Sequence, residues 1–441
     1  MRTRFAATCV LALAATTALA ACGSDDDGGN TGGDENVTLT VWDRSILRPE
    51  FGQDILATAF EEAHPGVTVE YIEQPSDIAQ ADQAFRSASL AEEGPDVVSL
   101  YAGGMVSSFA DFLEPLDEHL SDEDIDALDG WDTVRQGFDP DGALLGVPFG
   151  AGTYFEVFCN TQNLAAAGVD ASTPPTTWPE FLDFLASIRD GGQLPVMMGN
   201  QEGYTGAWVM AALVGGQIGT DGFFEMYAGD RPIDSDEFVE AYQAYQELFT
   251  TDRLTNPDAG SLTNGDGETK FFNGEGACFI SGDWQDGPLD ENLGAENVVT
   301  FPIPVLDSSS NVGAKAGGTA SALAVTNYSD NKDLAIEFVK FATSKEMLDA
   351  YVEALQIEPS NHVDADVELI QNPLLRTQTE ATQAASEQGP EFLIFPFDSI
   401  MPQQVNDLFY RMNAAVAGGQ TSPEDAASQL QAEYENWQQS Q

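Results

Sequence analysis

A strand, a helix and a second strand follow one another where the folded part of the sequence begins, and this order constrains the fold most. Residues 37–41 alternate apolar and polar side chains, as a half-buried strand does. Residues 49–63 repeat apolar side chains at helical spacing, and His64-Pro65-Gly66 ends that pattern. Residues 67–71 alternate again. Two strands joined by a helix favour a parallel sheet covered by helices, so the sequence predicts an α/β fold.

Further strands and helices are expected along the chain. Residues 94–101 and 144–149 are expected to be strands. Thr177-Trp178-Pro179-Glu180 has the pattern of a capping box, and a helix should begin there. Ser422 followed by Pro423 and two acidic residues predicts the start of a last helix.

The N-terminus has the features of an export signal. Arg2 and Arg4 precede an apolar run over residues 5–21, which is too short and too alanine-rich for a membrane span. The sequence Leu-Ala-Ala-Cys that ends at Cys22 resembles a bacterial lipobox, which implies cleavage after residue 21 and a lipid on Cys22. An ordinary secreted protein with an incidental cysteine is the alternative. Residues 22–36 would then be the lipidated cysteine and a flexible Gly- and Asp-rich tether.

The net charge disfavours one class of binding partner, and the cysteines raise the question of a disulfide. With 16 basic and 73 acidic residues, the chain carries a net charge of −57, which repels nucleic acid. An acidic excess spread over the surface is also typical of solubility or salt tolerance. Cys9 lies in the signal and Cys22 is the expected lipid site, so two of the four cysteines remain. After export, Cys159 and Cys278 form either a disulfide or two buried free thiols.

The motifs of common enzymes are missing. The sequence contains no G-x-S-x-G, no P-loop and no H-E-x-x-H. His64, His119 and His362 are scattered without zinc-ligand spacing, so we expect no metal and no cofactor. Paired carboxylates abound in so acidic a chain, and counting them neither supports nor excludes a glycosidase.

Aromatic residues beside polar groups follow several expected strands. Ligands of open α/β sheets bind at the carboxyl ends of strands, and sugar rings suit aromatic faces flanked by polar side chains. Each aromatic residue alone could equally serve packing. The candidates are Trp42 and Asp43, Tyr101, Glu202, Tyr204 and Trp208, and Asp283 with Trp284.

Six short segments carry a further signal. They are FEEAHPGVTV (60–69), GPDVV (94–98), GVPF (146–149), CN (159–160), PPTTWPE (174–180) and FFNGEGA (271–277), with residues 329–346 fitting a helix pair. In this order and spacing, they resemble the bacterial extracellular solute-binding proteins of family 1, which includes maltose-binding protein. The resemblance covers residues 37–437.

The resemblance implies a two-lobed periplasmic-binding-protein-like fold of type II, with a ligand cleft between the lobes. The first lobe would comprise 37–147 plus 305–353, and the second 148–304 plus 354–437. It also implies a monomeric binding protein without catalysis. The lobes would close on a carbohydrate, and the protein would deliver it to the permease subunits of an ABC importer from the extracytoplasmic face of the membrane.

Individual site residues carry over only in part. Glu202 and Tyr204 match the family's acid and stacking aromatic residue, and Trp284 matches a stacking Trp. Thr153 stands where the maltose-type site has an acid, which argues against maltose. Gly318 would offer a backbone amide. A late stacking Trp falls near Leu408 or Phe409, another departure, and Asp398 is a further candidate.

Two other functions remain open. Acidic and aromatic residues also bind cations, so a polyamine is an alternative ligand. The other alternative is a secreted glycoside hydrolase.

Overall fold

The computed structural model describes residues 36–75, 78–251, 253–357 and 365–440, and residues Val37–Gln441 make up one compact unit. The expected signal over 1–21, the lipidated Cys22 and the tether up to residue 35 lie outside the described residues. In the part that is described, none of the helices has the length and apolar character needed to cross a membrane.

The strands form one connected path in the order β2-β1-β3-β8-β4-β6-β5, with β7 added to β4 and β9 added to β8. Pairs β1–β2, β1–β3, β5–β6 and β8–β9 are parallel, and the others are antiparallel. The strands are β1 (Val37–Asp43), β2 (Val67–Glu73), β3 (Val97–Tyr101), β4 (Val147–Asn160), β5 (Val196–Met197), β6 (Cys278–Gly282), β7 (Val298–Pro302), β8 (Lys315–Val325) and β9 (Leu393–Ile394).

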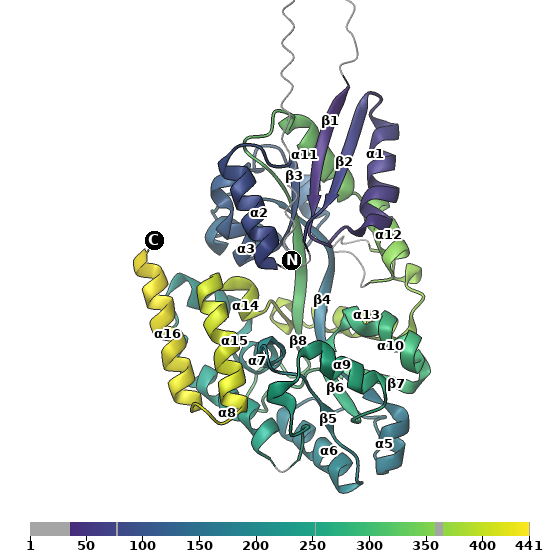
Figure 1. Cartoon of the computed structure of the whole chain (residues 1–441), viewed down its shortest axis with the longest axis vertical. Helices are drawn as coiled ribbons and strands as arrows, with labels where there is room; N and C mark the ends of the chain where they lie inside the picture. The colour runs from purple at the N-terminus through teal and green to yellow at the C-terminus, as the bar shows by residue number, and fades with distance from the viewer. Residues whose placement is uncertain (1–35, 76–77, 252, 358–364, 441) are drawn as a thin grey trace, which may run out of the picture. The chain divides into compact units, whose positions relative to one another are not determined.

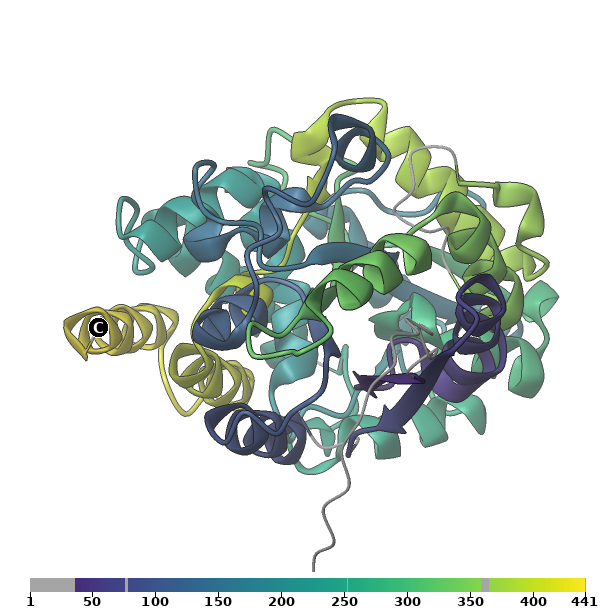
Figure 2. The same cartoon turned by 90° about the horizontal axis from the view of Figure 1, so that it is seen from above.

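Helices cover these strands (Figure 1). In the first half of the chain they are α1 (Thr58–Ala63), α2 (Ile78–Leu90), α3 (Gly104–Ser108), α4 (Asp122–Asp126), α5 (Thr161–Ala167), α6 (Trp178–Asp190) and α7 (Tyr204–Ala228). The later ones are α8 (Asp236–Thr250), α9 (Asn264–Phe272), α10 (Asp286–Leu293), α11 (Lys332–Ala342), α12 (Lys345–Leu355), α13 (Pro373–Ser386), α14 (Phe397–Ile400), α15 (Gln403–Ala417) and α16 (Pro423–Ser440). Helices α15 and α16 lie side by side in both Figure 1 and Figure 2.

The first strand–helix–strand unit is confirmed. Strands β1 and β2 pair in parallel from Val37 opposite Val67 onward. The connecting helix starts as a π-helical segment, η1 (Arg48–Ala57), and continues as α1. The expected strand over 144–149 begins later, at Val147, because Leu144 is held in an isolated bridge to Arg135.

Both predicted helix starts are also confirmed. The capping box of Thr177 and Glu180 is present at α6. At α16, the hydroxyl of Ser422 accepts a hydrogen bond from the backbone N–H of Asp425. Such caps satisfy N–H groups that the helix itself leaves unpaired.

Two large apolar cores define the two lobes. The first core takes its buried residues from 39–149 and 322–351. The second takes most of its own from 155–306 and 394–434. Val305, Leu306, Ala314 and Ala316 also pack in the second core, so the chain returns to the first lobe along β8 rather than at the expected boundary of 304/305.

Strands β4 and β8 connect the lobes as an antiparallel pair (Figure 1). Their pairing runs from Val147 opposite Leu323 to Tyr154 opposite Gly317 and shifts register between Phe149 and Gly152. Gly317 has a φ of +143°, and a Cβ on it would lie 2.1 Å from the carbonyl oxygen of Thr153. Only glycine therefore fits where the two crossing strands approach each other.

Two buried links hold the second-lobe ends of these strands. Cys159 on β4 and Cys278 on β6 lie directly opposite each other, and they form a disulfide with a Cα–Cα distance of 4.0 Å. Of the two states that the sequence leaves open, the structure therefore has the bridge. Lys315 on β8 lies 2.9 Å from the carboxylate of Glu156 on β4, and both side chains are almost completely buried.

Candidate functional site

An aromatic cluster lies in the second lobe and contains three of the expected site residues. Trp208 is central, with ring centroids 5.5 Å from Tyr204, 5.3 Å from Trp284 and 5.7 Å from Phe155. Tyr410 adds an edge contact to Tyr204 at 6.5 Å. Trp284 remains 38% exposed, so the cluster offers an aromatic surface to solvent. Aromatic surface of this kind suits the apolar face of a sugar ring.

Two glycines allow the cluster to assemble. Gly282 ends β6, and a Cβ on it would lie 2.0 Å from the Trp284 ring, so this position has room for glycine only. Gly203 precedes α7 with a φ of +84°, and a Cβ there would lie 1.9 Å from the carbonyl oxygen of Tyr410. These two approaches bring Trp284 and Tyr204 against their neighbours.

Asn264, the first residue of α9, connects the polar side chains beside the cluster. Its backbone N–H donates to Glu202 at 3.2 Å, and its side-chain amide donates to Oε1 of Glu268 at 2.6 Å. The amide of Gln285, next to Trp284, donates to the same Oε1 at 2.7 Å. Burial raises the pKa of both Tyr204 and Glu268, and the nearby charges of Glu202 and Glu268 raise the pKa of Tyr204 further.

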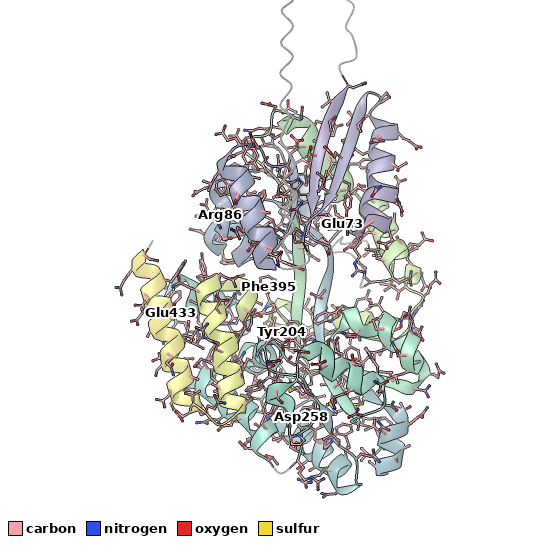
Figure 3. The ribbon with its side chains drawn as sticks, viewed as in Figure 1. Glu73, Arg86, Tyr204, Asp258, Phe395 and Glu433 are labelled. Atoms are coloured by element: carbon pink, nitrogen blue, oxygen red, sulfur yellow. A yellow bond between two sulfur atoms is a disulfide. The ribbon has the colours of Figure 1, made fainter. Side chains whose placement is uncertain are left out.

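Asp398 adjoins the cluster through Tyr410. The hydroxyl of Tyr410 donates to Oδ2 of Asp398 at 3.0 Å. Burial raises the pKa of the Asp398 carboxyl, and this hydrogen bond opposes the shift. Figure 3 shows Tyr204 and Phe395 on the second-lobe side of the crossing strands, and Phe395 lies within 3.4 Å of a Cβ built on Gly318.

In the first lobe, the structure gives Asp43 a different role from the expected one. Its carboxylate is fully buried and accepts hydrogen bonds from the backbone N–H groups of residues 46–48. The hydroxyls of Tyr71 and Ser99 donate to it at 2.7 Å each. This carboxylate is fully used inside the lobe, so we leave Asp43 out of the proposed site.

Other expected site residues lie either in the first lobe or on the strands β4 and β8 that connect the lobes. Trp42 lies half-buried against Phe85 of α2, with ring centroids 6.5 Å apart, and packs on the first core. Tyr101 is 38% exposed at the end of β3. Thr153 and Gly318 lie opposite each other where β4 pairs with β8.

Asp283 also serves the fold. It is buried, and its carboxylate accepts the backbone N–H of Tyr154 at 2.7 Å. This bond attaches the segment that carries Trp284 to β4. Asp283 therefore positions Trp284 rather than offering an acceptor to solvent.

Besides Asn264, sequence reasoning missed four residues of the site. Phe155 and Tyr410 belong to the aromatic cluster, and Glu268 and Gln285 belong to the Asn264 network. Glu268 lies four residues after Asn264 on α9, a spacing that places the two side chains on one helix face. Gln285 directly follows Trp284 in the sequence, and this adjacency could have identified it as a site residue.

The family of bacterial extracellular solute-binding proteins matches this chain over residues 46–348, which is more than half of its length. The protein belongs to this family. The order of the strands and the two cores agree with the two-lobed type II fold of such proteins.

Curated relatives extend over nearly the whole chain. The diacetylchitobiose binding protein DasA of Streptomyces coelicolor is 28% identical over 436 residues, covering 94% of each chain. The galactooligosaccharide-binding protein of Bacillus subtilis is 24% identical over 428 residues, covering 95% of this chain and 94% of the relative.

Solved structures share the fold. A chitin oligosaccharide binding protein superposes with a TM-score of 0.74 at 19% identity, covering 91% of this chain and 99% of its own. A structure from work on xylan utilization by Caldanaerobius polysaccharolyticus also has a TM-score of 0.74, at 20% identity, covering 90% and 99%.

Proposed function

We propose that this solute-binding protein captures an oligosaccharide and passes it to the membrane permease of an ABC importer. The aromatic cluster of the second lobe is the observation that carries the proposal. Trp284 presents an exposed ring, and the carboxylates of Glu202 and Glu268 lie near Tyr204 of the same cluster as hydrogen-bond acceptors. Apolar ring faces flanked by fixed polar groups match the two kinds of surface of a sugar. The names of the curated relatives, both of which bind saccharides, support the same ligand class.

The site that we propose has two halves. In the second lobe it consists of Glu202, Tyr204, Trp208 and Trp284, joined by Phe155, Tyr410, Asp398 and Glu268. Tyr101 from the first lobe and the backbone around Thr153 and Gly318 complete it. Closure of the lobes would bend β4 and β8 near the glycines of the crossing, and it would sequester the sugar from water.

We further propose that the protein is a monomer, held on the extracytoplasmic face of the membrane by a lipid on Cys22. It would bind and release its ligand without chemical change. A lipid anchor suits this function, because an extracellular capture protein that is not tethered is lost by diffusion.

A thermal-shift panel of neutral oligosaccharides, with spermidine included, tests the function. A ligand at one hundred times its dissociation constant adds about 2.7 kcal/mol to stability, which raises the melting midpoint by about 2–4 °C. Trp284→Ala should abolish the shift, whereas Trp437→Ala on α16 should retain it. A panel without any saccharide shift, or a shift by spermidine alone, would contradict carbohydrate capture. Release of shorter products during incubation would point to a hydrolase.

A further inference from the structure

The carboxylates of Glu202 and Glu268 have an unusual environment for acidic groups beside an aromatic cluster. Within the described residues, neither forms a salt bridge, and their protein partners are the neutral amide groups of Asn264 and Gln285. Lys270 lies on the same helix as Glu268 but pairs with Glu275 at 3.4 Å. Glu202 is exposed, whereas Glu268 is partly buried, and partly buried charges are normally compensated by an opposite charge. The negative charge of Glu268 is therefore not compensated by a cation of the described residues, and a positively charged group of a ligand can compensate it.

Glu268 is also held in a fixed orientation. Its Oε1 receives both the Asn264 amide at 2.6 Å and the Gln285 amide at 2.7 Å. No described residue donates to Oε2. With one oxygen fixed by two donors, the other is a preorganised acceptor close to Tyr204.

The rings around these carboxylates add a second attraction for a positive charge. The ring centroid of Trp208 lies 5.5 Å from that of Tyr204 and 5.3 Å from that of Trp284. Aromatic faces attract ammonium groups, and the effect grows when water is excluded. The net charge of −57 adds a field that draws cations toward the protein. In the first lobe, the buried Arg44 is already paired with Asp82, so its charge is compensated.

We propose that the site selects a saccharide that carries a free ammonium group, with the ammonium at Glu268 and Glu202 and a sugar ring on Trp284. This inference rests on the proposed function and names the ligand within it. The site would bind amino sugars more tightly than their N-acetylated counterparts and would disfavour saccharides that carry a carboxylate. Glu268 is the residue that determines this specificity.

Isothermal titration calorimetry with matched sugars tests the proposal. The probes are the β-1,4-linked dimer of glucosamine, its di-N-acetylated form, the corresponding monosaccharides and galacturonate, at about pH 6.5, where an amine is protonated and an ordinary carboxyl is ionised. We expect an amine-bearing sugar to bind at least about tenfold more tightly than its N-acetylated partner at low salt, a difference of about 1.4 kcal/mol. This preference should shrink as the salt concentration rises, because ions screen the attraction.

Substitutions test which carboxylates cause the preference for amine-bearing sugars. Glu268→Gln and Glu202→Gln should each reduce it, since both remove a negative charge and keep the shape of the side chain. Glu275→Gln removes the same charge from an exposed position after α9 and should leave the preference unchanged.

Three results would overturn the proposal. The first is an N-acetylated dimer that binds as tightly as the free amine or more tightly. The second is a preference that survives both Gln substitutions, and the third is no binding by any amine-bearing sugar. Carbohydrate capture fails separately, only if no saccharide of any charge binds.

Discussion

The two lobes hold the residues near the expected site by different means. In the first lobe, the carboxylate of Asp43 is the connecting element and accepts five hydrogen bonds from the protein. In the second lobe, a disulfide between β4 and β6 provides a covalent connection. Glu202 and Glu268 keep fewer protein partners. A carboxylate that stabilises the fold is not available to a ligand, whereas a lobe fixed by other means can leave its carboxylates free for one.

Removal of the disulfide should have the largest effect on stability. Cys159→Ala combined with Cys278→Ala opens a link between residues 119 positions apart, and the unfolding free energy should fall by about 4 kcal/mol. Urea unfolding of the oxidised protein and the variant measures the difference. The wild type in reductant should show a similar loss. An unchanged midpoint would mean that the second lobe is held by its packing alone.

Replacement of Asp43 should have the second-largest effect on stability. Asp43→Ala leaves buried N–H and O–H donors without an acceptor, which should lower the unfolding free energy by about 3 kcal/mol. Asp54→Ala removes an exposed carboxylate from the following helix and serves as the matched control. The comparison between the lobes breaks down if Asp43→Ala is as stable as the wild type but no longer binds ligand.

Neutralising Glu268 should not lower the unfolding free energy, in contrast to the two preceding substitutions. Burial raises the pKa of its carboxyl, so the folded protein holds the proton more tightly than the unfolded chain does. The ionised form therefore costs stability above the ordinary carboxyl pKa of about 4.3, and this cost disappears as the pH falls below that value. Glu268→Gln should be as stable as the wild type at pH 7 or more stable, by about 1 kcal/mol or less, and this difference should vanish near pH 4. Thermal unfolding at the two pH values measures it; a loss of stability at pH 7 would place Glu268 with Asp43 as a structural carboxylate.

The smallest effect concerns His64 at the end of α1. Its Nδ1 lies 2.9 Å from the carbonyl oxygen of Phe60, and its Nε2 lies 3.0 Å from the carboxylate of Glu337. Both partners are acceptors, so both hydrogen bonds form only when both ring nitrogens carry protons, and the hydrogen bond with Glu337 raises the pKa of His64. The stabilisation is then complete below the ordinary His pKa of about 6.5 and is lost as the pH rises through the raised value.

Because Glu337 is largely exposed, we expect this pair to contribute less than about 1 kcal/mol. His119, Asp124, Asp333 and Lys340 line the same surface pocket, and Lys340 already pairs with Asp124 at 2.8 Å. Urea unfolding at pH 5 and at pH 8 should show a smaller difference for Glu337→Gln than for the wild type. Equal differences would assign the pH dependence to another group.

Local sequence signals predicted local structure well. Alternation located β1 and β2, and the capping residues Thr177 and Ser422 marked where α6 and α16 begin. Each of these signals depends on residues close together in the chain. The expected boundary at 304/305, where a second-lobe segment ends and a first-lobe segment begins, rested on weaker signals: Val305 and Leu306 are apolar and suit either core, and only tertiary packing places them in the second.

The candidate site was predictable only in part. Tyr204 and Trp208 lie four residues apart on one helix, and a helix brings such a pair together. Trp284 joins them through β6, which the sequence suggested as an apolar run. The sequence could not distinguish Asp43 from Glu202, because both are acids beside aromatic residues. Their difference lies in distant donors such as Tyr71 and Ser99.

The two cores described above also determine when this protein can fold during its synthesis. The first core contains residues 322–351 as well as the N-terminal segments, so it lacks a part until most of the chain has been made. The central strand β8, which separates β3 from β4, is likewise a late segment. N-terminal domains usually fold first as they emerge from the ribosome, but this topology delays completion of the N-terminal lobe. The first lobe therefore cannot complete its core until late in translation.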